Sequence, residues 1–489
     1  MKLPRQILIL CLTALLTSCA VGPNFKKPEA PPVKDYTANP VSGTTSTTNV
    51  AGGQAQHFLA DQDIAGDWWT LFHSKPLNDL IERSLKANPN LKAAQAALAV
   101  ARENVKAQRG AYYPSASASF SAARQKTAEV IAPTPNNNDL YFNLFTPQVT
   151  VSYVPDVFGL NRRTVESLNA QVEQARFALV ASDIALSANV VAAAIQEASL
   201  REQIDATHHL IEINTNMLQI LRAQFARGYA NRLEVAAQES QLAQIVATLP
   251  PLLKQLAQQR DLLAALSGGF PSDGPAEKFE LAGLQLPQEL PLSLPSKLVA
   301  QRPDVRQAEE NMHAASAQVG IAAANRLPNF LLSADVGSMA LQAGQIFSSG
   351  TGFWGLAGSV TQPLFQGGTL LHRQRAAWAT YTNAAELYRA AVLTAFQNVA
   401  DTLVALEQDA HGLNAAAAAR DAAKITLDLS MQQWQSGYAS YLALLSAEQT
   451  YNQAVINLIQ AQANRYADTA ALFQALGGGW WNRSDLTKK

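Results

Sequence analysis

The sequence has few charged residues and no excess of either sign. Asp, Glu, Lys and Arg make up 15% of the 489 residues, and the formal net charge is -1. A nucleic-acid-binding surface needs a basic stripe or a strongly basic domain, so this class of function is excluded. Ala and Gln are common instead, which favours helices packed closely along their length over a highly charged soluble enzyme.

Cysteine is scarce as well, and the chain contains two, Cys11 and Cys19. Both lie in or beside an N-terminal leader, in which basic residues precede an apolar run over residues 7–16. This pattern predicts a secretory signal peptide over residues 1–18, and the run is too short for a membrane-spanning helix.

Removal of this leader leaves one cysteine, so the mature chain can form no internal disulfide. The end of the leader reads Leu-Thr-Ser followed by Cys19, which resembles a bacterial lipobox. Lipobox processing makes Cys19 the first mature residue and attaches diacylglycerol to its sulfur and an acyl group such as palmitate to its amine. Ala20 follows, and by resemblance to the sorting rules of such lipoproteins a residue other than Asp favours the outer membrane. The alternative is an ordinary signal peptide with a chance cysteine.

Long hydrophobic runs are also missing. No stretch of eighteen apolar residues follows the leader, so we expect no transmembrane helix. If such a chain crosses a membrane, it must do so as a closed β-barrel, because every backbone polar group in hydrocarbon needs a partner.

Motifs of enzymes and of metal sites are lacking too. The seven histidines are scattered, and HExxH, GxSxG, Walker and CxxC patterns do not occur. Five methionines without a cluster offer little to soft metal ions. We therefore expect no enzymatic activity, no catalytic residues, no cofactor and no bound metal.

What the sequence does contain is a tandem repeat. "RGYANRLEVAAQES" (227–240) matches "SGYASYLALLSAEQT" (436–450), and prolines and glycines recur in the same order in both halves. Order-preserving matches over whole halves indicate a duplication. We predict the following segments: a signal peptide (1–18), a lipidated extended arm (19–66), a first repeat (67–270), an equatorial connector (271–296), a second repeat (297–476) and a C-terminal tail (477–489).

Each repeat has the pattern helix, strand, loop, strand, long helix, turn, helix. Alternation of small or polar with apolar residues predicts four strands, at about 112–124, 146–158, 329–340 and 352–362. About ten residues is the length that crosses a bilayer at a tilt, and aromatic residues cluster near the strand ends. A small soluble sandwich is the alternative.

Four strands cannot close a barrel, and an open sheet would leave unpaired edges in hydrocarbon. Several copies must therefore pool their strands. Two copies give eight strands, a barrel that side chains fill, whereas three give twelve and leave a lumen. We expect a homotrimer with a twelve-stranded barrel.

Prolines mark the junctions between strands and helices. Because proline lacks the amide hydrogen and clashes with a preceding helical turn, neither element runs smoothly through it. Nearby glycines permit a sharp change of direction. We predict elbows that turn each strand into a helix, at Pro114, Pro155, Gly159, Pro328, Pro363 and Gly367.

Very long helices follow these elbows. The stretches 160–227 and 368–436 contain almost no helix breakers, and apolar residues recur every seven positions in the first. Each would be roughly 100 Å long. Shorter helices (90–111 with 231–267, and 303–326 with 441–476) would stack beside them. The fold class is thus a mostly α, α+β membrane protein whose barrel continues as a helical tunnel. A soluble antiparallel coiled coil is the alternative for the helices alone.

Four stretches resemble the TolC-like outer membrane efflux family, in its NodT/OprM-like lipoprotein branch. They are "DWWTLFHSKPLNDLIERSLKANPNL" (67–91), "RPDVRQAEENMHAASAQVGIAAANRLPNF" (302–330), "VTQPLFQGG" (360–368) and "LGGGWW" (476–481). The resemblance implies a trimeric exit duct that conducts drugs or other small molecules passively from periplasm to exterior. It also implies a periplasmic adaptor and an inner-membrane resistance-nodulation-division pump as partners. Exit ducts for protein secretion or for metal ions are the alternatives.

By the same resemblance, the tips where the long helices turn back should narrow the tunnel and dock the adaptor. The candidate docking residues are Gly228, Tyr229, Leu233, Gly437 and Tyr438. Gly228 and Gly437 suit helix ends that need a positive φ.

The second tip matches the gate region of the family, in which an aromatic, a Leu, an Asp and an Arg close the aperture. The matching residues here are Trp434, Leu442, Ser446 and Gln449. Since Ser446 cannot contribute to a carboxylate ring, we expect an apolar constriction at Leu442 that is held by hydrogen bonds instead of ion pairs. Ordinary helix packing at Leu442 is the alternative.

Overall fold

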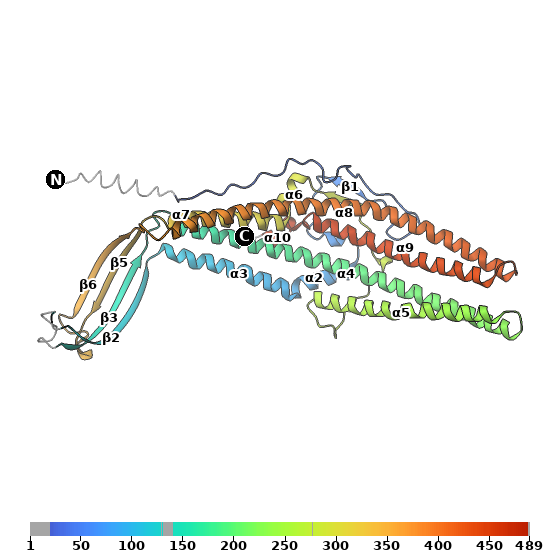
Figure 1. The fold of residues 1–489 in the computed structure, drawn as a ribbon, viewed down its shortest axis with the longest axis horizontal. Helices are drawn as coiled ribbons and strands as arrows, with labels where there is room; N and C mark the ends of the chain where they lie inside the picture. Colours follow the sequence, from blue (N-terminus) through green and yellow to red (C-terminus); the bar gives the residue numbers. More distant parts are fainter. Residues whose placement is uncertain (1–19, 129, 131–139, 276, 488–489) are drawn as a thin grey trace. The chain divides into compact units, whose positions relative to one another are not determined.

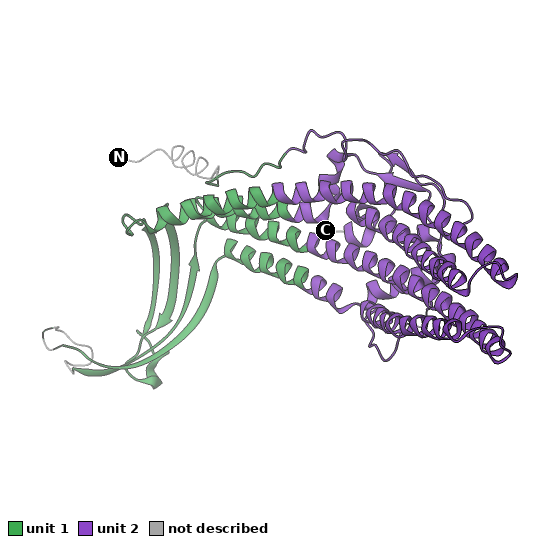
Figure 2. Ribbon diagram, turned by 45° about the vertical axis from the view of Figure 1, so that its right-hand side comes forward, with its two compact units in different colours: residues 1–28, 97–175, 308–388 green, residues 29–96, 176–307, 389–489 purple. Residues whose placement is uncertain are grey.

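The computed structural model describes residues 20–128, 130, 140–275 and 277–487. The expected signal peptide and Cys19 lie outside these residues. The chain forms two compact units, 1–28, 97–175 and 308–388 in unit 1 and the remainder in unit 2 (Figure 2). Neither unit follows one sequence repeat. Each draws segments from both, because the long helices α4 (Leu160–Ala226) and α8 (Thr369–Gln435) run through both units.

Unit 1 contains a four-stranded antiparallel sheet (Figure 1). The strand order is β2-β3-β5-β6, with β2 at Ser115–Lys126, β3 at Tyr141–Tyr153, β5 at Asn329–Ser338 and β6 at Gly352–Thr361. In the described part of the chain, the outer edges of β2 and β6 have no neighbouring strand. The sheet is therefore open on both sides.

Two strand positions differ from the sequence prediction. The expected strand at 112–124 begins at Ser115, because Gly110–Tyr112 forms a 3-10 turn before Pro114. The expected strand at 146–158 begins five residues earlier, at Tyr141, and ends at Tyr153. The Asp156 carboxylate accepts from the amides of Asn161 and Arg162, both at 2.9 Å, and so caps the start of α4.

The two faces of the sheet differ in polarity. Ser117 pairs with Thr150, and the Thr150 hydroxyl donates to Asp335 at 2.6 Å. On the other face the large side chains are exposed, with 75% of Trp354 and 77% of Leu356 accessible. Exposing so apolar a face to water is unfavourable, so lipid or protein must cover it.

Pro147 interrupts the ladder between β3 and β5. Phe145 and Ala340 exchange backbone hydrogen bonds at 2.9 and 3.0 Å, and continuous pairing resumes at Gln148 with Gly337. Since proline has no amide hydrogen, the intervening bond cannot form.

The helices of each repeat match the predicted pattern closely. In the first repeat they are α3 (Pro89–Arg109), α4 and α5 (Arg232–Leu266), and in the second α7 (Pro303–Ala324), α8 and α9 (Tyr441–Ala475). One described helix, α4, is long and apolar enough to cross a membrane by length and composition. This apolar stretch of α4 was not expected from the sequence. However, 61% of it is buried within the chain, as in the core helix of a soluble protein.

Unit 2 brings together parts of three of the conspicuous sequence stretches. Trp68 of η1 (Trp68–Phe72) stacks on Phe473 with ring centroids 5.2 Å apart. Arg302 donates to the Ala475 carbonyl at 2.8 Å, and the Trp480 indole donates to the Gln301 carbonyl at 2.7 Å. These contacts join the starts of the 67–91 and 302–330 stretches to the end of α9 and to the residues that follow it.

Some elements of unit 2 were not expected from the sequence. They are α2 (Lys75–Ala87), α6 (Pro295–Gln301), α10 (Ser484–Thr487) and a parallel pair of short strands, β1 (His57–Ala60) in the N-terminal arm and β4 (Glu289–Leu292) in the connector.

Candidate functional site: the helical tips

Each long helix ends in the same turn. The amide of Tyr229 donates to the Gln224 carbonyl at 2.9 Å, and that of Tyr438 donates to the Gln433 carbonyl at 2.8 Å. Gly228 and Gly437 have φ of 78° and 76°, as expected for a glycine that ends a helix in this way. The positive φ predicted for both glycines is confirmed.

The returning helices begin with side-chain caps. Asn231 accepts from the Glu234 amide at 2.9 Å, while the Glu234 carboxylate accepts from the Asn231 amide, which forms a capping box at α5. Ser440 accepts from the Ala443 amide at 3.3 Å at the start of α9. The two tips therefore share turn geometry and differ in side chains.

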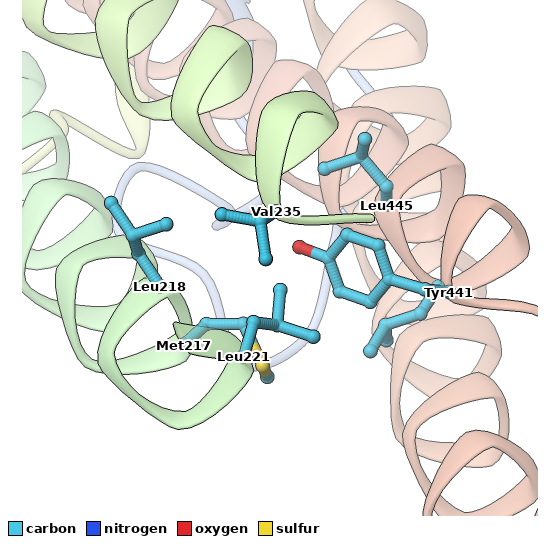
Figure 3. Packing of buried hydrophobic residues seen from close by; sticks show 7 residues of the cluster. Met217, Leu218, Leu221, Val235, Tyr441 and Leu445 are labelled. Atoms are coloured by element: carbon cyan, nitrogen blue, oxygen red, sulfur yellow. The ribbon is translucent and has the colours of Figure 1, made fainter. Parts of the chain in front are cut away.

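A hydrophobic cluster holds the two tips together (Figure 3). Its buried members come from α4, α5 and α9: Met217, Leu218, Leu221, Val235, Tyr441, Leu444 and Leu445. Trp434 packs against this cluster, with its ring 5.8 Å from that of Tyr441. The aromatic residue predicted in the gate is thus half-buried and packs against the tip core.

The other predicted gate residues lie together on one face of α9. Leu442, Ser446 and Gln449 are spaced by four and three residues, so they form a stripe along the helix. All three are exposed in the single chain, Leu442 to 49%. The tip residues Tyr229, Leu233 and Tyr438 are exposed as well, to 83%, 64% and 88%.

Polar side chains connect α9 to α4 and α5, the helices of the first-repeat tip. The Tyr441 hydroxyl donates to Gln238, which in turn donates to the Asn214 side-chain oxygen at 3.0 Å. Gln449 donates to Gln241 at 2.5 Å. Gln238 and Asn214 are almost fully buried, so their hydrogen bonds strongly constrain how the helices pack.

Glu448 is a buried carboxyl group in the same region. Only 4% of its surface is exposed, and among the described residues its Oε2 atom has no hydrogen-bond partner. Burial raises the pKa of Glu448 to about 7. Sequence reasoning did not identify Glu448, Tyr441, Gln238 or Gln241 as site residues. The sequence signal that could have identified Tyr441 and Glu448 is their spacing, because residues seven apart lie on one helix face.

The predicted elbow residues are found at the junctions of unit 1. Pro114 and Pro328 directly precede β2 and β5, and Pro155 and Pro363 follow β3 and β6 by two residues. Gly159 and Gly367 have φ of 78° and 56°. Among the described residues, no group of three His, Cys, Asp or Glu side chains is placed to hold a metal ion.

The sequence and fold match known proteins over most of the chain. The family model "Outer membrane efflux protein" matches residues 80–269 and 294–478. The probable efflux pump outer membrane protein TtgC of Pseudomonas putida is 27% identical over 98% of this chain and 97% of its own length. The probable outer membrane lipoprotein SilC of Salmonella typhimurium is 24% identical over 97% and 99%. The solved structure of the outer-membrane channel OprN superimposes with a TM-score of 0.82 at 25% identity, covering 94% of this chain and all of that one.

The chain belongs to the outer membrane efflux protein family. It is a transport protein of the outer membrane, the exit duct of an efflux pump, and it is not an enzyme. The predicted fold class, location and function are thereby confirmed.

Proposed function

We propose that three copies of this chain form one duct, in which their twelve strands close a barrel and their helices continue as a tunnel. The observation that carries this proposal is the open sheet, with two unpaired edges and one exposed apolar face in the described residues. Each strand of this four-stranded sheet has ten to thirteen residues, enough to cross a bilayer at a tilt. Joining β6 of one copy to β2 of the next keeps the sheet antiparallel and removes both edges.

The stripe of Leu442, Ser446 and Gln449 is the proposed constriction of this duct. Three copies of an exposed leucine around an axis give an apolar ring, which resists the passage of water and ions. The Gln449–Gln241 and Tyr441–Gln238 hydrogen bonds fix the position of α9 relative to α5. Trp434 supports the stripe from the tip core.

The outer ends of the tips are the proposed docking surface for a periplasmic adaptor. Tyr229, Leu233 and Tyr438 expose large apolar side chains on rigid, capped turns, which suits protein recognition. Gly228 and Gly437 contribute by setting the turn geometry.

The remaining partners and substrates follow from the family. We propose a lipid anchor at Cys19 and a resistance-nodulation-division pump in the inner membrane. The similarity to SilC, a probable outer membrane lipoprotein, supports the anchor. The conducted substrates are drugs or other small molecules. Protein secretion and metal-ion efflux are the alternative cargoes.

Gene deletion tests this function. The deleted strain should become more susceptible to a panel of toxic compounds, and a plasmid copy should restore resistance only when the partner pump is present. Unchanged susceptibility to every compound, together with a defect in protein secretion, would contradict the small-molecule assignment.

A further inference from the structure

Arg465 of α9, in unit 2, is a fully buried arginine whose hydrogen bonds are incomplete. Its Nη2 atom donates to the Thr44 hydroxyl at 2.9 Å and to the Gln54 carbonyl at 2.6 Å. Its Nε and Nη1 atoms have no hydrogen-bond partner among the described residues. A buried guanidinium is stable only when acceptors or an opposite charge lie close by, so a carboxyl group is expected beside these two donors.

Asp409 of the neighbouring helix α8 lies near enough to interact electrostatically with this guanidinium. The two helices pack together in this region, because Leu413 of α8 shares a hydrophobic cluster with Leu458 and Ala461 of α9. One helical turn further on, Asp409 and Arg465 occupy facing positions. The Oδ2 atom of Asp409 is buried and also has no hydrogen-bond partner in the described part of the chain. Two donors and one acceptor are therefore left unpaired on adjoining helices.

Asp468, which follows Arg465 by one turn of α9, gives Asp409 a different partner. The Asp409 and Asp468 carboxyl groups lie within hydrogen-bonding reach of each other. Ionised carboxylates only accept hydrogen bonds and repel each other, so a hydrogen bond between the two groups requires one proton. Burial and this second carboxyl group raise the pKa of Asp409 to about 7, and the positive charge of Arg465 opposes the rise. The titration belongs to the pair of carboxyl groups.

The other elements packed around this pair contribute little charge. The N-terminal arm supplies only the Thr44 hydroxyl and the Gln54 carbonyl. On α9, Tyr466 interacts with Arg465, but burial raises the pKa of Tyr466 to about 12, so its ring is neutral near pH 7. α4 brings Glu202 close to Tyr466. Asp468 and Arg465 are the charged groups that act on Asp409 itself.

We propose that Asp409 and Asp468 form a proton-binding site in which one shared proton clamps α8 to α9, with Arg465 as its positioning residue. With the proton bound, the two carboxyl groups hold each other across the helices, and Arg465 remains on its Thr44 and Gln54 acceptors. When the proton leaves to solvent, the carboxylates repel, and the unpaired Nε and Nη1 donors of Arg465 are the groups available to Asp409. Because α8 and α9 join at the second tip, pH determines how firmly this hairpin is held.

Two substitutions remove the need for the proton and keep the size of the side chain. Asp409→Asn and Asp468→Asn each introduce an amide, which can donate to the remaining carboxylate at any pH. Asp401→Asn, at an exposed position two turns away on α8, is the matched control. Arg465→Gln removes the positive charge that favours ionisation of the pair.

Infrared spectra of the full-length protein, purified in detergent with isotope-labelled aspartate, detect protonated aspartic acid and separate it from Glu448. At about pH 5.5 an ordinary aspartate is almost fully ionised. We expect a protonated-carboxyl component in the wild type that disappears as the pH rises through about 7. Both asparagine variants should lack this component, and Asp401→Asn should retain it. A component lost only in Asp409→Asn, or no titrating component in the wild type, would overturn the shared site.

Hydrogen exchange of residues 403–413 and 462–470 tests the clamp itself. The pKa of Asp409 is raised from 3.8 to about 7, so the folded protein binds the proton more tightly than the unfolded chain, and the clamp weakens as the pH rises to about 7. After correction for intrinsic rates, exchange should accelerate at least about tenfold between about pH 5 and about pH 8 in the wild type, and less than about threefold in either asparagine variant. Equal acceleration in all three proteins would overturn the clamp.

The same pH series tests the role of Arg465. Arg465→Gln should move the midpoint of the exchange transition and of the infrared titration upward by about one pH unit, because the nearby positive charge is lost. A general loss of packing would change the exchange rates without moving the infrared midpoint. An unchanged infrared midpoint would therefore contradict the positioning role of Arg465.

Discussion

Glu239 and Glu448 occupy equivalent positions in the two repeats, 209 residues apart, but have opposite surroundings. Glu239 pairs with Arg222 at 2.8 Å on the surface. The residue equivalent to Arg222 in the second repeat is Met431, and Glu448 is buried. The duplication has therefore preserved the turns while giving the second tip a carboxyl group that resists ionisation.

This asymmetry predicts a pH dependence of the second tip. The pKa of Glu448 is raised from 4.5 to about 7, so the folded tip binds a proton more tightly than the unfolded chain. The stabilisation that Glu448 contributes to the folded tip is fully present below pH 4.5. It is lost as the pH rises to about 7, and the loss in stability is at most roughly 3 kcal/mol. Tyr441 lies near enough to interact electrostatically with both Glu448 and Glu234.

The Glu448→Gln variant checks this prediction. Hydrogen exchange of residues 441–449, measured at several pH values and compared with the wild type, should show a difference that grows between pH 4.5 and 7 and then levels off. Glu239→Gln is the control at the equivalent exposed site and should show no such growth. Parallel curves for Glu448→Gln and the wild type would show that Glu448 titrates normally.

The hydrogen bond between Tyr441 and Gln238 predicts a second effect. Tyr441→Phe leaves a buried amide oxygen without a donor, which should destabilise the tip by about 1–3 kcal/mol. Local hydrogen exchange in α9 measures the loss. Tyr438→Phe, at an 88% exposed ring, is the matched control and should change little. Equal exchange in the two variants would mean that this bond contributes nothing to packing.

The turn geometry predicts a third effect. Gly437→Ala keeps open space around the new methyl group but forces a side chain into φ of 76°, which should cost about 1–2 kcal/mol. Gly412→Ala, within α8 and also in open space, should instead stabilise the helix by about 1 kcal/mol. Exchange rates at the end of α8 distinguish the two signs, and a stabilised Gly437→Ala tip would contradict the observed turn.

The proposed constriction predicts a change in conductance. Leu442→Ser should raise the single-channel conductance in planar bilayers, because a polar ring is wetted more easily than an apolar one. Leu233→Ser substitutes the equivalent residue of the first repeat and should leave conductance unchanged. No increase in Leu442→Ser would place the constriction elsewhere.

The long helices could be predicted from the sequence because both stretches contain almost no helix breakers, and apolar residues recur every seven positions in the first. Strand ends were less accurate, since alternation does not mark where Asp156 begins to cap α4. The pairing of β1 with β4 joins segments about 230 residues apart in the chain, and four-residue strands carry no periodic signal of their own.

The candidate site was predicted in part. Leu442, Ser446 and Gln449 were predicted from the resemblance to the gate region of the family, and the structure places them on one face of α9. The burial of Glu448 and the partial burial of Trp434 depend on how α9 and the end of α8 pack against helices of the other repeat, which local sequence does not specify. Apolar and polar tip residues therefore could not be sorted into core and surface in advance.

In the proposed duct, one chain supplies a third of a closed wall. Native mass spectrometry of the purified protein in detergent tests it most directly. We predict a single assembly of three chains that survives dilution, because separation would expose the edges of β2 and β6. A stable monomer or dimer would contradict the account.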